Sequence, residues 1–461
     1  MTLKNILLAL LAVSLLSVSC KVKKKDFAEF TTSDITANDI YRHIAMLTSD
    51  SMQGRMAGTP YEALAAEYIK EKFKSLGLKA FNGNYLQTVP MFTRSYFDNC
   101  ELYFDGYKGN YPADFRPMIM FDSLTAAGEI VFAGYGNDSD YGSLDVKGKW
   151  VMVLENAASF LYDKKATAKK HGAVGLIVIG IDGTTGDERY ALPADSTPML
   201  KISKNFSDRL LAHAGTTVSE VSAKLKAGEN QYFSIPVVVH ATIKSTKQQV
   251  ASHNAVAYLE TNDSKSEDGY IVVGAHYDHL GTRPVHDSLQ IFRGADDNAS
   301  GVAGILEIAK KLRTAKKLKY NVIFAAFGAE ELGLIGSRYF CNNPPVPCEK
   351  IKLMINMDMM GRADSVNHSY INTVRPNANI DAVLDKIKKS HPGITPAMKS
   401  DSLKNTDYAP FYERKIPVIS FTTGLHSAYH TPADTLGAIN CKGEKLFLDY
   451  IYDFLLKEEG H

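Results

Sequence analysis

Imidazoles and carboxylates gather just past four apolar runs in the second half of the chain. The set comprises His276 with Asp278, Glu330 with Glu331, Asp358, and His430. Each run has the length and composition of a buried strand, and the carboxyl ends of parallel strands meet at one edge of a sheet. We therefore expect these side chains, which are far apart in the sequence, to converge on one site.

These residue types are typical of a hydrolytic zinc site. Zinc binds imidazole and carboxylate ligands, and the sequence has no Cys-x-x-Cys pair that would indicate a thiolate site. Two histidines and three carboxylates are enough for two ions that share one bridging carboxylate. Such a pair polarises a carbonyl group and lowers the pKa of bound water. The adjacent acids Glu330 and Glu331 then offer one ligand and one general base.

Strands alternate with helices from residue 254 onward, which predicts the elements that carry these side chains. We expect strands over 270–275, 321–327, 353–357 and 417–421, and helices over 300–312, 332–340, 380–390 and 444–456. This alternation predicts an α/β fold with a mixed, largely parallel central sheet and helices on both of its faces.

The first part of the chain predicts two helices. One covers 32–47, with Ser33 or Asp34 as a possible N-cap. The other is amphipathic, covers 62–76 and ends at Gly77.

A middle block, residues 123–241, differs from the rest of the chain. It alternates short strand-like runs with short helices, and it holds no cluster of histidines with carboxylates. Its length is sufficient for a domain of its own. The segments 148–153 and 164–178 resemble a protease-associated domain, which implies a β-rich insert at this position.

Size and composition exclude some classes of function. A chain of 461 residues predicts two or three domains. It is 45% hydrophobic and 22% charged, as expected of a globular protein, and its net charge of +1 gives no indication of nucleic acid as a partner. Nothing in the sequence indicates the oligomeric state.

The N-terminus reads as a targeting segment. A basic start and a short apolar run fit a secretory signal peptide over 1–19. The small residues before Cys20 resemble a bacterial lipoprotein signal, which implies a lipid on Cys20 and a tether over 20–31. We thus expect an exported cell-envelope lipoprotein that touches the membrane only through this lipid. The alternative is an ordinary signal peptide, or a short membrane anchor, with an unmodified Cys20.

Export changes how the remaining cysteines are interpreted, because disulfides form in oxidising compartments. Cys341 and Cys348 bracket a proline-rich loop and could pair. Free buried thiols are nearly as good an interpretation of the same two residues.

Five short motifs then resemble, in order and spacing, the metal-site motifs of the co-catalytic zinc aminopeptidase family. They are His-Tyr-Asp-His-Leu-Gly at 276–281, Gly-Ala-Asp-Asp-Asn-Ala-Ser-Gly at 294–301, Gly-Ala-Glu-Glu-Leu-Gly-Leu-Ile-Gly-Ser at 328–337, Asn-Met-Asp-Met-Met-Gly at 356–361 and His-Thr-Pro-Ala-Asp-Thr at 430–435. Segments 43–50 and 54–60 resemble the usual start of that catalytic domain. The resemblance implies a zinc-peptidase domain formed by 32–122 and 242–461, interrupted by the insert at 123–241.

The resemblance also implies a ligand set for two zinc ions per chain. Asp297 would bridge the two ions. His276 and Asp358 would complete the coordination of one ion, and Glu331 and His430 that of the other.

Three further residues receive roles from the same resemblance. Glu330 would be the general base, and Tyr429 would help to stabilise the oxyanion. Asp278 would orient the His276 imidazole, a pairing that is also expected on physical grounds because zinc-bound histidines commonly bond to a carboxylate.

Other polar residues near the motifs match no ligand position. His279, His286 and His426 are interpreted as pocket or loop residues. Asp296, next to the bridging acid, is interpreted as a residue that hydrogen-bonds the loop.

The resemblance implies a peptidase that removes residues from peptides with a free N-terminus. One alternative is a glutamate-carboxypeptidase-like enzyme, which needs a basic pocket for a C-terminal carboxylate. The arginines available for such a pocket are Arg293, Arg338, Arg362 and Arg375. Another alternative is a glutaminyl cyclase-like acyltransferase with one zinc ion. A non-enzymatic binding module is disfavoured because all five ligands are present.

Overall fold

The computed structural model describes residues 32–95, 99–118, 123–155, 161–180, 188–190, 197–260, 269–285, 288–314, 318–364, 370–374, 378–392, 397–399 and 406–458. The expected signal peptide, Cys20 and the tether lie outside these residues, as do His286 and Arg375. Across the described ranges, no helix combines the length and apolar character needed to cross a membrane.

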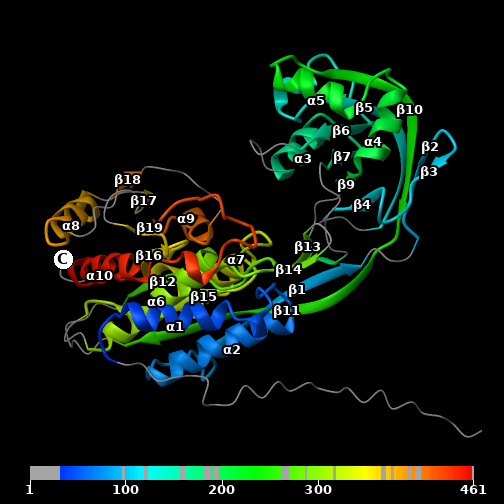
Figure 1. Cartoon of the computed structure of the whole chain (residues 1–461). Coiled ribbons are helices and arrows are strands. Elements are labelled where there is room, and N and C mark those ends of the chain that lie inside the picture. Colours follow the sequence, from blue (N-terminus) through cyan, green and yellow to red (C-terminus); the bar gives the residue numbers. More distant parts are fainter. Residues whose placement is uncertain are drawn as a thin grey trace, which may run out of the picture.

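A nine-stranded mixed sheet forms the centre of the larger lobe, in the order β18-β17-β19-β16-β12-β15-β11-β1-β8 (Figure 1). In that order the strands are Ala397–Lys399, Tyr370–Val374, Val418–Thr422, Ile351–Met357, Tyr270–His276, Asn321–Phe327, Thr246–Leu259, Leu86–Ser95 and Glu188–Tyr190. The four central strands β19, β16, β12 and β15 are parallel. This arrangement confirms the predicted mixed α/β fold and puts β12 in the middle of the parallel part.

Both faces of this sheet are buried, which explains the continuous apolar runs of its strands. Along β12, Ile271, Val273 and Ala275 pack into one hydrophobic cluster, whereas Val272 packs into another on the opposite face. Side chains alternate between the faces along a strand, so the run fills both clusters. The neighbouring strand β15 alternates in the same way.

Helices cover the two faces unequally. The larger cluster includes residues from α1 (Ala37–Leu47), α2 (Pro60–Ser75), α6 (Gly301–Leu312), α8 (Ala378–Lys388) and α10 (Cys441–Glu458). The smaller cluster on the other face includes residues from α7 (Ile335–Asn342) and α9 (Ala409–Glu413). Figure 1 shows α1, α6 and α10 together on one side of the sheet, with α7 and α9 on the other.

The helix starts differ from the sequence prediction by one to five residues, and those of α1 and α7 are the most informative. The N-cap of α1 is Thr36, whose Oγ1 accepts the backbone N–H of Asp39 at 3.0 Å, and not Ser33 or Asp34. The backbone N–H of Thr36 bonds to Glu307 Oε2 at 2.8 Å, a long-range contact that local sequence does not reveal.

Helix α7 begins at Ile335 and not at residue 332. The preceding residues form a turn in which Leu334 has a left-handed backbone with φ of 62°. This turn follows the strand that delivers Glu330 and Glu331, so the late start of the helix leaves both acids on a loop.

The middle block folds around a second sheet of eight strands, in the order β3-β2-β10-β5-β6-β7-β9-β4. In that order they are Tyr107–Lys108, Glu101–Phe104, Tyr232–Ile243, Leu124–Ala133, Trp150–Leu154, Gly175–Ile179, Met199–Ile202 and Phe115–Pro117. Helices α3 (Leu161–Lys170), α4 (Lys204–Ala212) and α5 (Val218–Lys226) belong to the same lobe. The fully buried Trp150 lies in its core.

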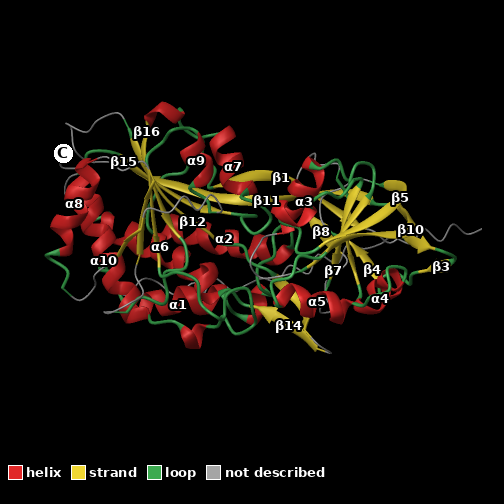
Figure 2. Cartoon of the chain, turned by 90° about the horizontal axis from the view of Figure 1, so that it is seen from above, coloured by secondary structure: helices red, strands yellow, loops and turns green. Residues whose placement is uncertain are grey.

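Sheet membership differs from the boundary expected at residue 123. Strands β2, β3 and β4 precede that residue and nevertheless join the second sheet, because β2 pairs with β10 and β4 with β9. Conversely, β8 lies inside the middle block and pairs with β1 of the large sheet. The two lobes are joined by the long antiparallel pair β1 and β11 (Figure 2).

Candidate metal centre

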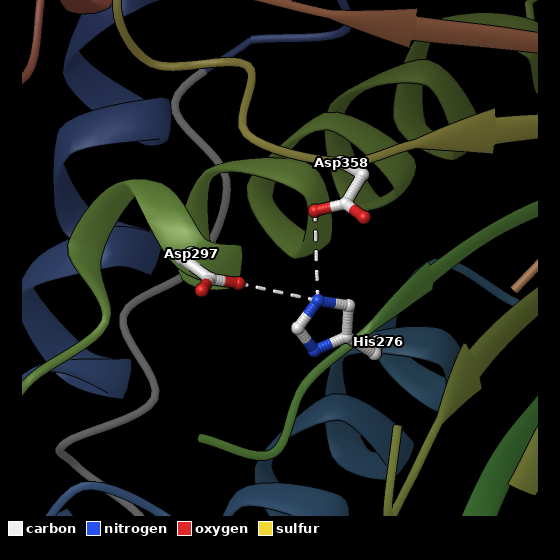
Figure 3. Close-up of side chains that lie close together, drawn as sticks. All are labelled: His276, Asp297 and Asp358. Carbon is white, nitrogen blue, oxygen red and sulfur yellow. Dashed lines mark ion pairs between the residues drawn. The ribbon is translucent and has the colours of Figure 1, made fainter. Parts of the chain in front are cut away.

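Strand β12 ends at His276, whose imidazole faces two carboxylates from other elements. Its Nε2 lies 3.3 Å from Asp297 Oδ1 and 3.5 Å from Asp358 Oδ1. Figure 3 shows the three side chains pointing toward one another from a strand end, a helix start and the end of a second strand. The structure therefore brings together residues 82 positions apart in the sequence, as the strand-end argument predicts.

A second group lies on the other side of Asp297. His430 Nε2 is 3.1 Å from Asp297 Oδ2 and 3.2 Å from Glu331 Oε2. His279 also belongs to this group, because its Nδ1 lies 2.8 Å from Glu331 Oε1 and 3.7 Å from Asp297 Oδ2. The sequence predicts only a pocket or loop residue at His279, and its contact with Glu331 depends on tertiary structure.

The donor sets of both groups fit metal ions. His276, Asp297 and Asp358 form one cluster that could hold an ion, and His279, Asp297 and Glu331 form another, so that Asp297 is shared. Asp297 Oδ2 is buried and accepts no hydrogen bond of good geometry from the described residues, although His430 Nε2 is near. A buried, unsatisfied carboxylate oxygen is costly, and a cation at this point would satisfy it.

The charges in the site point to the same need for positive charge. Burial acts to raise the pKa of Asp297, but the nearby imidazoles of His276 and His430 outweigh it and hold that pKa well below its usual range. Burial acts to lower the pKa of His430, but Asp297 and Glu331 raise it to about 10. With this pKa the His430 imidazole is protonated near neutral pH, and a ligand histidine must release its proton when a metal binds.

Glu330 lies next to the first group without belonging to either cluster. Its Oε2 is 3.9 Å from His276 Nε2, and its side chain is 13% exposed. Burial raises its pKa well above the usual range, and the nearby carboxylates of Asp407, Glu331 and Asp358 add to this shift. A carboxylate of raised pKa that remains accessible is suited to accept a proton.

The turn that carries Glu330 and Glu331 is held by Asp278. Ala329, just before the turn, has a left-handed backbone with φ of 56°, a strain of the kind that clusters at functional sites. Asp278 Oδ1 accepts the Glu330 N–H at 2.9 Å, and Asp278 Oδ2 accepts the Glu331 N–H at 3.3 Å. The end of β12 therefore fixes the turn that follows β15.

The contact between Asp278 and His276 differs from a simple ring–carboxylate hydrogen bond. His276 Nδ1 lies 3.8 Å from Asp278 Oδ1 and 3.2 Å from the backbone carbonyl oxygen of Asp278. The expected role of Asp278 in orienting the imidazole stays a prediction, and its backbone carbonyl is the nearer partner.

Asp297 sits where a helical turn is interrupted. The segment Ala295–Ser300 leaves helical geometry at Asp297 and Asn298, whose φ values are −104° and −134°. Asp434 Oδ2 accepts the Asp297 N–H at 3.0 Å, and the Asn298 amide donates to the carbonyl oxygen of Met357 at 3.0 Å. These bonds fix Asp297 relative to the strand that precedes Asp358.

Asp296 has the role expected for it. Its Oδ1 accepts the backbone N–H of Gly361 at 2.6 Å, and its Oδ2 lies 3.1 Å from His426 Nε2. Asp296 therefore links the loop after Asp358 to the loop that carries His430. His426 contributes to this link through its contact with Asp296.

Tyr429 stands beside the second group at the solvent side. Its ring stacks on that of His430, with centroids 3.8 Å apart, and the residue is 38% exposed. His430 itself has a left-handed backbone with φ of 55°. The oxyanion role of Tyr429 stays a prediction.

Four residues that hold or flank the site received no role from the sequence. Arg55, Asn298 and Asp434 all lie inside the motifs that carry the family resemblance. Each is a polar residue in a motif with no role assigned to it, and this was the feature of the sequence that could have identified them. Asp407 lies in none of them. It is 1% exposed, and neither of its carboxylate oxygens has a hydrogen-bond partner of good geometry among the described residues. Burial raises its pKa to about 6.

Comparison with known proteins tests the family inferred from the motifs. The model of Peptidase family M28 matches residues 254–455, which include every residue of both metal clusters. Residues 254–455 are therefore similar to an M28 peptidase domain. The PA domain model matches residues 124–210, within the second lobe. The resemblance to a zinc aminopeptidase family with a protease-associated insert, predicted from the sequence, is therefore confirmed.

The relatives reported next are all named aminopeptidases. Aminopeptidase YwaD of Bacillus subtilis is 27% identical over 67% of this chain and 62% of its own length. The probable lipoprotein aminopeptidase LpqL of Mycobacterium tuberculosis is 29% identical over 50% of this chain and 40% of its own length. Leucine aminopeptidase 2 of Trichophyton rubrum is 28% identical over 62% of this chain and 53% of its own length. The chain thus spans less than two thirds of each.

Solved structures confirm the fold. The aminopeptidase from Aneurinibacillus sp. strain AM-1 is 24% identical, with a TM-score of 0.62, and the match covers 92% of this chain and 94% of that one. A zinc aminopeptidase from Bacillus subtilis is 20% identical, also with a TM-score of 0.62, over 93% of this chain and 96% of that one. The fold of this chain is therefore shared with these proteins.

Proposed function

We propose that this chain is a zinc aminopeptidase that hydrolyses the N-terminal peptide bond of peptides. The observation that carries the proposal is the pair of metal-binding clusters that share Asp297, with Glu330 beside them. The names of the relatives and the solved zinc aminopeptidase structures support it.

The proposed site holds two zinc ions. Asp297 would be shared between them, His276 and Asp358 would hold one, and Glu331 and His430 would hold the other. Bound zinc supplies Lewis acidity toward the scissile carbonyl and lowers the pKa of water in the site.

Glu330 acts as the general base in this proposal. It takes a proton from the attacking water and passes it to the leaving amine, so that no net proton is consumed. Asp278 holds the Glu330 N–H at 2.9 Å and thereby fixes the backbone from which the base projects. The Tyr429 hydroxyl donates a hydrogen bond to the developing oxyanion.

Exposure indicates the side from which a peptide arrives. Within the site, His430 and Asp358 have side chains that are 35% and 19% exposed, whereas those of His276 and Asp297 are at most 4% exposed. The substrate would therefore approach over His430 and Asp358.

The carboxypeptidase alternative receives no support from the described arginines. Arg338 pairs with Glu413 at 3.0 Å. Arg293 bonds to Asp50 Oδ1 at 2.6 Å and also to a backbone carbonyl oxygen. Arg362 lies 3.8 Å from Asp296. Each has an acidic neighbour, which disfavours a role in binding a C-terminal carboxylate.

A comparison of blocked and unblocked peptides tests the exopeptidase assignment. We expect a peptide with a free N-terminus to be cleaved at its first bond, and its N-acetylated counterpart to be cleaved far more slowly. An enzyme that cleaves both at equal rates does not recognise the N-terminus. Release of the C-terminal residue from the acetylated peptide would establish the carboxypeptidase alternative. Cyclisation of an N-terminal glutamine with one zinc ion per chain would establish the acyltransferase alternative.

We further propose that the protein is exported and carries a lipid on Cys20. The sequence around Cys20 supports this, and the name of the relative LpqL is consistent with it. Growth with a labelled fatty acid should label the wild-type protein, while a Cys20→Ala variant stays unlabelled. Equal labelling of both proteins would contradict the assignment.

A further inference from the structure

A fully buried arginine lies directly beneath the metal centre and belongs to neither metal cluster. Arg55 is 0% exposed although it follows a loop of small and polar residues. Buried arginines usually pair with carboxylates, but the described residues form no ion pair with this guanidinium. It instead donates four hydrogen bonds, all of them to backbone carbonyl oxygens.

These four carbonyls belong to three separate segments. Arg55 Nε donates to Tyr277 O at 2.7 Å, and Nη1 donates to Leu47 O at 2.6 Å and to Arg293 O at 2.8 Å. Nη2 donates to Gly294 O at 3.0 Å. Tyr277 stands between His276 and Asp278, and Gly294 starts the segment that carries Asp297. One guanidinium thus connects the backbones of both halves of the first metal cluster.

The backbone around Arg55 reinforces this connection. Arg55 has a left-handed backbone with φ of 49°, and its carbonyl oxygen accepts the His279 N–H at 3.3 Å. The preceding Gly54 accepts the Gly281 N–H at 3.0 Å. A Cβ at Gly54 would collide with the carbonyl oxygens of Phe292 and Gly281, so this position requires glycine.

We propose that Arg55 is a positioning residue that fixes the separation of His276 and Asp297 before metal binds. The planar fork of a guanidinium spans several acceptors in a fixed geometry, which an ammonium group cannot do. Burial lowers the pKa of Arg55 to about 10, with nearby acids led by Asp278 and Asp297 opposing the shift, so the group stays charged near neutral pH. The inference rests on the proposed zinc site, but it concerns metal binding and not turnover.

Zinc affinity is the readout that distinguishes positioning from general stabilisation. Zinc dissociation constants are measured by competition with a chromophoric chelator for wild type, Arg55→Lys and Arg55→Met. We expect both variants to bind zinc about 10- to 100-fold more weakly, the usual effect of losing a residue that orients ligands. The visible spectrum of the cobalt-loaded variants should also change, because the ligands then surround the ion in a different geometry.

Arg293→Met is a matched control. Arg293 lies next to Gly294, and its side chain bonds to Thr48 O at 2.7 Å and to Asp50. It therefore stabilises the same part of the fold as Arg55, but from the protein surface. It makes no contact with the Tyr277 carbonyl. We expect this control to lower the melting temperature without changing zinc affinity. The proposal would be overturned if both Arg55 variants kept the zinc affinity and the cobalt spectrum of wild type. If only Arg55→Lys kept them, the positive charge and not the planar guanidinium would position the ligands.

A measurement on the wild-type protein covers the case in which no Arg55 variant folds. Hydrogen exchange of the His279 and Gly281 amides is compared with and without zinc. A preset site keeps both amides protected after zinc removal, and rapid exchange in the metal-free protein would overturn the proposal. If wild type itself binds no zinc, the proposed function fails, which is a separate result.

Discussion

The two carboxylate oxygens of Asp278 divide their hydrogen bonds between neighbouring residues, and the shorter one, 2.9 Å, joins Asp278 to the backbone N–H of Glu330. Asp278 ends the segment that begins with the metal-cluster residue His276, whereas Glu330 follows the adjacent parallel strand. The proposed base and the first metal cluster are therefore held in register by one buried side chain.

Replacing this acid should uncouple the two segments. In Asp278→Asn, one of the two backbone N–H groups faces an amide N–H₂ in place of an acceptor oxygen, so the turn loses a buried hydrogen bond. We expect kcat/KM to fall about 10- to 100-fold, measured with an unblocked peptide at saturating zinc. Asp138→Asn, an exposed acid of the second lobe, should have wild-type activity. Wild-type kinetics of Asp278→Asn would contradict the coupling.

His279 should support Glu331 and not bind metal itself. Its Nδ1 lies 2.8 Å from Glu331 Oε1, whereas His430 faces the other oxygen, Oε2. In His279→Gln we therefore expect two zinc ions per chain. The ion held by Glu331 and His430 should bind about 10- to 100-fold more weakly than in wild type. Metal analysis after dialysis against buffered zinc checks this. A stoichiometry of one zinc ion per chain, with normal affinity, would make His279 a ligand.

Glu444 should make stability decrease with pH. It is fully buried, neither of its carboxylate oxygens has a partner among the described residues, and burial raises its pKa well above 4.5. Above pH 4.5 the unfolded chain loses this proton while the folded protein retains it. The free energy of unfolding then falls with rising pH, by about 1.4 kcal/mol per pH unit.

A neutral isostere isolates this effect. We expect Glu444→Gln to melt at a higher temperature than wild type near pH 8 and at nearly the same temperature near pH 5, in thermal scans of the metal-free protein. Glu413→Gln, which removes an exposed acid paired with Arg338, should show no such divergence. If the difference in melting temperature between wild type and Glu444→Gln were the same near pH 5 and near pH 8, Glu444 would be ionised in the folded state.

Cys341 and Cys348 should be free thiols. The structure has both in the reduced form, and Cys348 Sγ lies 3.9 Å from the carbonyl oxygen of Cys341 as a weak donor. Thiol titration of the denatured, unreduced protein lacking residues 1–20 should count four thiols, the number of free cysteines in the described chain. Two missing thiols, restored by a reductant, would establish the disulfide.

The sequence was sufficient for those parts of the site that depend on local pattern. Strand β15 has the predicted bounds, and the polar groups after β12, β15 and β16 converge because parallel strands end at one edge. Identity of the fold followed from five motifs in one order, which a chance arrangement rarely reproduces.

The parts that could not be predicted depend on contacts between distant segments. Strand β2 joins the second sheet because it pairs with β10, and no local pattern identifies that partner. Arg55 is buried only because three remote segments turn carbonyl groups toward it. Left-handed backbone at Ala329 is also imposed by tertiary structure, since alanine rarely adopts it.

The most direct test of the central claim is the activity of Glu330→Gln with its metal content known. Glutamine preserves the shape of the side chain but cannot take a proton, and Glu330 belongs to neither metal cluster. We predict two zinc ions per chain, as in wild type, and hydrolysis of an unblocked peptide reduced by about 10²- to 10⁴-fold, the usual contribution of general base catalysis. Full hydrolytic activity with normal zinc content would contradict the assignment of Glu330 as the base of a two-zinc aminopeptidase.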